Sequence, residues 1–292
     1  VVTQAPYPVI SYKQAMLEFG TDKPDLRNPL RIVDTTDFFQ RCTFKPFHGK
    51  TVRAIKVHAD MSKGFHEKLL KFAQSIGMGG LGYLEVLEDK SYKGPIDKFI
   101  PDDMKQEIAD IANLEVGDTI FFIADTEEHA ALYAGQIRNE LGARLDLLEK
   151  NAYRFCFIND FPMFEYDKEA KKIIFTHNPF SMPQGGLEAL NTKDPRDILA
   201  YQYDIVCNGV ELSSGAVRNH NLDIMVKAFE IAGYTEEDLK EKFGALYNAF
   251  QFGAPPHAGM APGVDRMIML LRNEENIREV IPFPMNGNAQ DL

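Results

Sequence analysis

Two carboxylates lie seven residues apart in a predicted β-hairpin. Residues 203–213 read YDIVCNGVELS, and Asn-Gly at 208–209 between two apolar runs is a strong signal of a type I′ turn. A regular ladder from this turn pairs Asp204 with Ser213, so Asp204 and Glu211 become diagonal neighbours on one face, roughly 7–8 Å apart. Such a pair can hold one Mg²⁺ ion, which usually also binds substrate phosphates. Two unrelated acids on a solvated face are the simpler interpretation of the hairpin alone.

An arginine follows this hairpin at position 218. Strict alternation of side chains points Arg218 to the face opposite Glu211, so a shared site requires a β-bulge. We expect the bulge at Ser214-Gly215, because glycine within a strand often marks one. An arginine beside the two acids can bind a substrate carboxylate through two parallel hydrogen bonds. A surface arginine without a role is the alternative.

Residues 252–263 are rich in glycine and proline and precede a predicted helix that begins near Asp265. Small residues let the backbone approach a ligand closely, and the positive end of a helix attracts an anion. Arg266 lies in the first helical turn, where a cation is unfavourable for the helix dipole. We therefore expect a negative group in front of Arg266. An ordinary loop before a core helix would explain the glycines but not the arginine.

A single histidine, His177, lies in a proline-bounded loop that is followed by Gln-Gly-Gly at 184–186. Such a residue can contact a ligand from a lid, although a lone histidine is more often structural. The sequence contains no GxSxG, HExxH or P-loop pattern. The run GMGGLG at 77–82 matches GxGxxG, but a predicted helix precedes it and a predicted strand follows, the reverse of a dinucleotide site. We interpret it as a helix stop and a turn.

The elements predicted to position these residues follow two different patterns along the chain. Between residues 44 and 150, strands are predicted at 51–59, 82–88 and 119–124, and helices at 65–76, 102–112 and from Thr126 to Gly142. After residue 150, strands in hairpin order are predicted at 153–158, 173–176, 203–207 and 210–213. Strands in that order form an antiparallel sheet, so the last segment is expected to be α+β.

Composition limits the class of protein. The 292 residues carry 32 basic and 43 acidic side chains, a net charge of −11, and 45% are hydrophobic, enough for about two domains. This acidity argues against non-specific nucleic-acid binding as the main activity. Three distant cysteines argue against a disulfide scaffold and for a cytosolic compartment, and no apolar run is long enough to span a membrane. The N-terminus has neither an initiator methionine nor a signal peptide, which suggests a cut end.

In combination these features resemble bacterial-type aspartyl-tRNA synthetases, which are class II aminoacyl-tRNA synthetases. The run GVDR at 263–266 before an apolar helix resembles motif 3 of class II. Residues 203–218 are similar to the strands that bind metal and amino acid, and HNPF at 177–180 to the flexible loop. Residues 12–27, ending in GTDKPDLR, resemble the segment after motif 2. Two departures are Asn178, where many members have histidine, and Ser213-Ser214, where many are richer in glycine.

This resemblance implies an α+β fold: part of an antiparallel class II catalytic domain with an inserted α/β domain of the GAD type. The implied domains are catalytic at 1–43, GAD insertion at 44–150, and the catalytic half with motif 3 at 151–292. We find neither motif 1, motif 2 nor an anticodon-binding barrel. The chain is therefore expected to be a fragment that lacks full activity alone.

The resemblance also implies roles for individual residues. L-Aspartate would be bound by His177 and Arg218, Mg²⁺ by Asp204 and Glu211, and ATP by Glu211, Gly263, Val264, Asp265 and Arg266, with Glu211 and Arg266 catalytic. The implied reaction is attack of the aspartate α-carboxylate on the α-phosphate of ATP, then transfer to the 3′ end of tRNA-Asp, stabilised mainly by electrostatics and positioning.

The implied enzyme is a cytoplasmic homodimer without a membrane anchor, and whether it also charges tRNA-Asn stays open. Two alternatives differ in class. A non-catalytic tRNA- or protein-binding adaptor would be expected to have lost the ligand residues, yet Asp204, Glu211, Arg218 and Arg266 are all present. A metabolic ATP-dependent ligase would adenylate an acid other than aspartate, so a panel of acids separates it from the synthetase.

Overall fold

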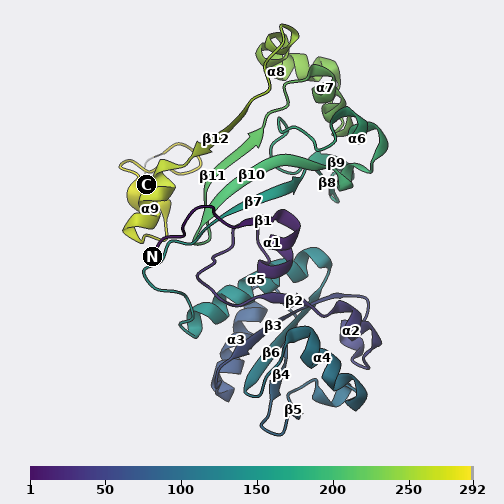
Figure 1. Ribbon diagram of the computed structural model, residues 1–292, viewed down its shortest axis with the longest axis vertical. Coiled ribbons are helices and arrows are strands. Elements are labelled where there is room, and N and C mark those ends of the chain that lie inside the picture. The colour runs from purple at the N-terminus through teal and green to yellow at the C-terminus, as the bar shows by residue number, and fades with distance from the viewer. Residues whose placement is uncertain (291–292) are drawn as a thin grey trace. The chain divides into compact units, whose positions relative to one another are not determined.

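A computed structural model describes residues 1–290 and shows two units (Figure 1). Unit 1 consists of Val1 and Gln14–Arg154, and unit 2 of Val2–Lys13 and the chain from Phe155 onward. Residues 14–43, expected to belong to the catalytic domain, are thus part of unit 1, because the strand they contain pairs within the unit 1 sheet. The assignment of functional domains stays a prediction. Among the described residues, no helix has the length and apolar character needed to cross a membrane.

Alternating apolar side chains build the sheet of unit 1. Its strands, in spatial order, are β2 (Ile32–Asp34), β3 (Thr51–His58), β6 (Asp118–Asp125), β4 (Gly82–Val86) and β5 (Tyr92–Lys93), all in antiparallel pairs. Along β3, Val52 and Ala54 point to one face while Ile55 and Val57 point to the other. All four are at most 1% exposed, so helices must cover both faces.

Those helices are α2 (Thr36–Arg41), α3 (Lys63–Ser75), α4 (Lys105–Ala112) and α5 (Glu127–Arg144), while α1 (Tyr12–Phe19) precedes the first strand of this sheet in the chain. Side chains cap α3 and α5, since the Ser62 and Thr126 hydroxyls accept hydrogen bonds from backbone N–H groups three residues on. The predicted end of the last helix at Gly142 is wrong, because α5 continues to Arg144. A Cβ on Gly142 would lie 2.3 Å from Nδ2 of Asn28, so this glycine makes room for a neighbour and does not stop the helix.

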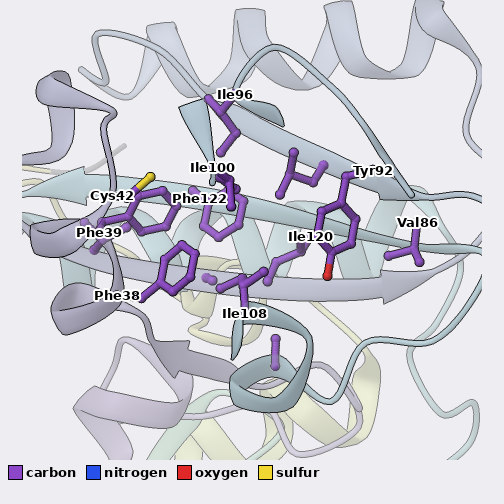
Figure 2. Packing of buried hydrophobic residues seen from close by; sticks show 14 residues of the cluster. Phe38, Phe39, Cys42, Val86, Tyr92, Ile96, Ile100, Ile108, Ile120 and Phe122 are labelled. Carbon is purple, nitrogen blue, oxygen red and sulfur yellow. The ribbon is translucent and has the colours of Figure 1, made fainter. Parts of the chain in front are cut away.

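Two apolar clusters fill the layers on either side of this sheet. Side chains from α2 and α4 pack on one face, where Figure 2 shows Phe38, Phe39 and Phe122 grouped together with Ile108 nearby. Side chains from α3 and α5 pack on the other. The predicted alternation of strands and helices is confirmed. In the structure these elements form three layers, with the sheet between two layers of helices. The glycine run after α3 is a turn that leads into β4, and Gly77 at φ +102° ends the helix as predicted.

A buried arginine ties the segment before β2 to α5. Arg138 is fully buried, and its Nε donates to the carbonyl of Leu30 at 2.7 Å, while Nη2 donates to those of Asn28 at 2.8 Å and Asp25 at 3.0 Å. Burial lowers the pKa of Arg138 to about 10, so the guanidinium is still charged at neutral pH. Backbone carbonyls therefore compensate this buried charge.

Unit 2 is built around a second five-stranded sheet. Its strands, in spatial order, are β1 (Val9–Ser11), β7 (Phe155–Pro162), β10 (Leu199–Cys207), β11 (Val210–Val217) and β12 (Ala258–Pro262). The predicted antiparallel, α+β arrangement is confirmed for β7 through β12, whereas β1 pairs with β7 in parallel.

The remaining elements of unit 2 are the hairpin β8 (Phe164–Asp167) and β9 (Lys172–Phe175) and the helices α6 (Gly186–Thr192), α7 (Leu222–Ile231), α8 (Glu236–Gln251) and α9 (Val264–Arg272). Short 3₁₀ helices occupy Lys45–Phe47, Asp97–Phe99, Asp102–Met104, Pro195–Asp197 and Ile277–Val280. Helices α7 and α8 pack through Met225, Phe229, Leu239 and Tyr247. A capping box formed by Thr235 and Asp238 begins α8.

Candidate active site

The hairpin that carries the two predicted carboxylates turns where expected. Asn208 and Gly209 have φ of +51° and +83°, the positive values that a type I′ turn requires. Next to the turn, Cys207 lies opposite Val210 and Val206 lies opposite Glu211, the pairs that a regular ladder from this turn requires. The turn chemistry therefore determines the first two cross-strand pairs.

Beyond Glu211 the regular ladder is interrupted. Asp204 lies opposite Ser214, so the predicted pairing with Ser213 is wrong, and so is the predicted bulge at Ser214-Gly215. The extra residue is Leu212, whose carbonyl accepts a hydrogen bond from the backbone N–H of Gly263 at 2.7 Å. A bond to the segment leading into α9 thus accompanies the bulge, which no local pattern could reveal.

This bulge brings Arg218 to the face of the sheet that carries Asp204 and Glu211. Residues opposite each other, and residues two apart, share a face. Asp204 and Val206 are two residues apart on β10, and Glu211 lies opposite Val206, so Asp204 and Glu211 share a face. Ser214 lies opposite Asp204, and Arg218 follows Ser214 by four residues on the same strand. Arg218 therefore shares the face of Asp204 and Glu211. At roughly 3.3 Å per residue, Glu211 and Arg218 lie about 20 Å apart along the strand.

Small side chains form the surface between these two ends. On β12, Gly259 lies opposite Ala216 and Ala261 lies opposite Ser214, which puts all four on the face of Arg218. Ala216 is buried, while the other three are at least partly exposed. Small residues allow a ligand to lie close to the strand backbone, as was expected for this glycine-rich run.

Arg218 is half-buried at the end of β11, beside the loop that carries His177. It lies opposite Ser181, and the flanking bonds join Asn219 N to Phe180 O and Met182 N to Val217 O, both at 2.8 Å. This pattern defines a non-hydrogen-bonded pair, in which the two side chains are closest. Within residues 1–290, neither the Arg218 guanidinium nor the fully buried Ser181 hydroxyl has a hydrogen-bonding partner. Sequence reasoning missed Ser181, whose only local signal is its position four residues after His177.

Arg266 in the first turn of α9 faces the negative group that its position predicted. Its Nη1 donates to the carbonyl of Glu211 at 2.7 Å and lies 3.3 Å from the Glu211 Oε1 atom. A Cβ on Gly263 would come within 3.3 Å of the Arg266 side chain, so the glycine leaves room for that side chain to reach Glu211. Val264 and Asp265 are exposed. The start of α9 thus joins Glu211 at one end of the face.

His177 is exposed and lies between two aromatic rings. Its ring centroid is 4.9 Å from that of Phe161 and 6.0 Å from that of Tyr12. The loop is anchored beyond this point, where the Gln184 Nε2 atom donates to Asp160 Oδ1 at 2.7 Å. Asp160 has φ of +55° within β7, a conformation that an aspartate tolerates better than most residues. An anchored loop can hold His177 at the edge of the sheet.

The donor atoms on this face are oxygens, not thiolates. Cys156 on β7 lies opposite Val206. Burial raises the pKa of Cys156 to about 12, so its thiol is neutral at physiological pH. No group of three histidine, cysteine, aspartate or glutamate side chains in residues 1–290 is arranged to hold a metal ion. Two carboxylates on one face fit Mg²⁺ when substrate phosphates and water complete its coordination.

The family model described as tRNA synthetases class II (D, K and N) matches residues 2–287. The chain belongs to this family. It is 55% identical over 293 residues to the aspartate–tRNA(Asp/Asn) ligase of Ehrlichia canis (strain Jake), covering 98% of this chain and 50% of the relative. The aspartate–tRNA(Asp/Asn) ligase of Zymomonas mobilis is 53% identical over 298 residues, covering 100% and 50%. The chain thus spans about half the length of these curated relatives.

Among solved structures, the aspartyl-tRNA synthetase of Entamoeba histolytica is similar, with a TM-score of 0.36 and 19% identity over 83% of this chain and 44% of that one. Membership of the class II synthetase family therefore rests on the sequence matches. The bulge at Leu212, which places Arg218 on the face of Asp204 and Glu211, comes from the structure alone.

Proposed function

We propose that this chain is the part of an aspartate–tRNA ligase that binds L-aspartate and ATP. The whole enzyme would join L-aspartate to tRNA-Asp, using ATP. The observation that carries the proposal is the β-bulge at Leu212, which brings a half-buried, unpaired Arg218 to the face of Asp204 and Glu211. Class II family membership and relatives named aspartate–tRNA(Asp/Asn) ligases support the choice of amino acid.

In this proposal Arg218 binds the side-chain carboxylate of L-aspartate through its forked guanidinium. The loop with His177 closes over the amino acid from one side. An oxygen of the aspartate α-carboxylate attacks the α-phosphorus of ATP, and diphosphate leaves, which gives aspartyl-adenylate. The 3′-terminal hydroxyl of the tRNA then attacks the acyl carbon, and AMP leaves.

At the other end of the face, Glu211 of the hairpin contacts ATP together with the residues at the start of α9, which are Gly263, Val264, Asp265 and Arg266. Asp204 and Glu211 would hold Mg²⁺, since their oxygens suit this ion and its usual partners are substrate phosphates. When bound, the ion would neutralise part of the phosphate charge that develops in the transition state. Arg266 and Glu211 act as the catalytic pair, the first stabilising phosphate charge and the second orienting the first.

The proposal extends to the surroundings of the site. Residues 44–150 would be a GAD-type insertion between two parts of the catalytic domain, 1–43 and 151–292. The whole enzyme would be a cytoplasmic homodimer, and buried, unbridged cysteines agree with a reducing compartment. The names of the relatives include both tRNA-Asp and tRNA-Asn, so charging of tRNA-Asn is part of what should be tested.

Calorimetric titration with a non-hydrolysable aspartyl-adenylate analogue tests the amino-acid site. Arg218→Ala is expected to lose about 2–5 kcal/mol of binding free energy, because a carboxylate would be left without its charged partner. Arg272→Ala, which removes an exposed arginine from the last turn of α9, is the matched control and should bind like the unmodified chain.

Analogues carrying asparagine, glutamate and a simple aliphatic acid complete the test. A site built around a guanidinium should bind the uncharged asparagine analogue much more weakly than the aspartyl one, because the half-buried charge of Arg218 would lose its partner. Equal binding of the aspartyl and asparaginyl analogues would contradict the role of Arg218. Preferential binding of the aliphatic analogue would favour a metabolic ligase.

A further inference from the structure

A hollow with a different chemistry lies in unit 1, between α3 and the end of α5. Its volume is about 580 Å³, and it is lined by Phe65, Lys68, Lys71, Phe72, Ser75 and Arg144. Three cations and two aromatic rings thus surround one open depression. None of these residues belongs to the candidate active site described above.

Helical spacing explains how aromatic and basic residues alternate here. Phe65, Lys68 and Phe72 lie three and four residues apart, so they share one side of α3, while Leu69 and Ala73 point into the core. Both phenylalanine rings pack on that core and are half-buried, which fixes their positions. Packing on the core therefore fixes the two rings, and Lys68 and Lys71 lie next to them on α3.

The cations of the hollow are only partly neutralised. Lys68 and Lys71 are exposed, and neither forms an ion pair with any residue in the described part of the chain. Arg144 is paired with Glu140, with Nε at 2.6 Å from Oε1, and its guanidinium lies over the Phe72 ring at 6.0 Å. In a chain with net charge −11, helix α3 carries three lysines and one glutamate. The hollow is thus a local positive site on an acidic molecule.

We propose that this hollow binds an unpaired segment of RNA. Phosphates would contact Lys68, Lys71 and Arg144, and an unstacked base would contact the exposed part of the phenylalanine rings. Basic side chains combined with aromatic rings are the usual means of binding single strands, because every base has a face that can stack. An acidic peptide would use the cations but not the rings. The site is independent of the amino-acid site and adds a contact to the proposed reaction's RNA substrate.

Fluorescence anisotropy with a labelled oligouridylate tests the proposal directly on this chain. Lys68→Glu combined with Lys71→Glu is expected to raise Kd at least tenfold. Lys45→Glu combined with Lys98→Glu is the control: it changes charge equally in unit 1, and Lys98 also lies over an aromatic ring, that of Phe99, at 5.1 Å. This control should leave Kd within twofold. Circular dichroism melting checks that both variants stay folded.

Two further readouts separate phosphate contacts from base contacts. Three phosphate contacts predict a slope of about −2 in log K against log salt, at roughly 0.7 per phosphate of a single strand. Phe72→Leu should weaken binding several-fold without changing this slope. An RNA duplex of equal length should bind more weakly than the single strand. Equal loss in the control variant, or tighter binding of the duplex, would overturn the proposal.

The outcome is distinct from that of the proposed ligase function. Arg218→Ala should bind the oligouridylate like the unmodified chain, since it leaves the hollow intact. The doubly substituted Lys68/Lys71 variant should bind the aspartyl-adenylate analogue normally. Failure of RNA binding with retained analogue binding would therefore reject the RNA site alone.

Discussion

Gly215 lies on β11, opposite Tyr203 on β10 and Met260 on β12. It points to the face opposite Arg218, where a Cβ would come within 2.5 Å of Tyr203 Cε2 and 2.7 Å of the Gly259 carbonyl oxygen. The Gly259 oxygen belongs to the backbone of β12, so it cannot move away without displacing that strand. This glycine is therefore required by close packing of the strand that carries the site.

Gly215→Ala is accordingly expected to destabilise unit 2 by about 1–3 kcal/mol, the usual range for overpacking. Ser213→Ala on the same strand is the control, because the buried Ser213 hydroxyl has no hydrogen-bonding partner in the described residues and its removal should be close to neutral. Urea denaturation measures both. Equal effects of the two substitutions would show that the predicted clash is relieved.

His66 links the stability of unit 1 to pH. Its side chain is 9% exposed and its ring stacks on Tyr83 with centroids 4.2 Å apart. Burial lowers the pKa of His66 below its ordinary 6.5, although Glu85, 3.2 Å from Nε2, partly opposes this, while nearby Lys93 adds to the lowering. The unfolded chain thus binds more protons between the two pKa values, and stability falls as pH decreases below about 6.5.

The melting temperature of unit 1 should therefore fall between about pH 7.5 and pH 5. His66→Phe keeps a ring against Tyr83 but cannot be protonated, so the fall should be smaller. His129→Gln, which replaces an exposed histidine of α5, should leave the profile unchanged. An identical pH profile for His66→Phe and the unmodified chain would contradict this role of His66.

At the scale of elements, two helical glycines in unit 1 should respond in opposite ways to the same substitution. Gly135 in α5 faces the end of α1, and a Cβ there would lie 2.8 Å from the Gly20 carbonyl oxygen. Gly135→Ala is therefore expected to cost about 1–3 kcal/mol. A Cβ at Gly64 in α3 would meet only Ser62 Oγ, at 3.8 Å, so Gly64→Ala should stabilise by about 0.5 kcal/mol. Thermal melts of the two variants should shift in opposite directions.

Most elements could be predicted from local pattern, while two errors came from contacts distant in sequence. The turn at Asn208-Gly209 requires positive φ at both residues, and Ser62 and Thr126 cap helices with their own side chains, so neighbouring residues suffice. Gly142 looked like a helix stop, but its missing side chain makes room for Asn28. The bulge at Leu212 involves a bond to Gly263, about fifty residues away.

The same distinction applies to the candidate site. Residue types and spacing were enough to nominate Asp204, Glu211, Arg218 and Arg266. The structure adds the Arg266–Glu211 contact and the position of the bulge that brings Arg218 to the face of Asp204 and Glu211. Ser181 could not be nominated, because what distinguishes it is burial opposite Arg218, a pairing between distant segments.

At the scale of the whole molecule, the chain contains two units with separate apolar cores. Each core is formed by side chains from its own unit, so each unit has its own source of cooperativity. Thermal unfolding is therefore expected to show two calorimetric transitions, and a single melting temperature would not describe this chain.

Two independent perturbations should assign these transitions. Gly135→Ala should lower only the transition of unit 1. The aspartyl-adenylate analogue, at about 100 times its Kd, should stabilise unit 2 by about 2.7 kcal/mol and raise only the other transition, because a ligand stabilises the state that binds it. Scanning calorimetry of the unmodified chain, the variant and the analogue complex measures both shifts. If one transition moved with both perturbations, the two units would unfold together, and stability changes in unit 1 would then alter the population of the folded aspartate site.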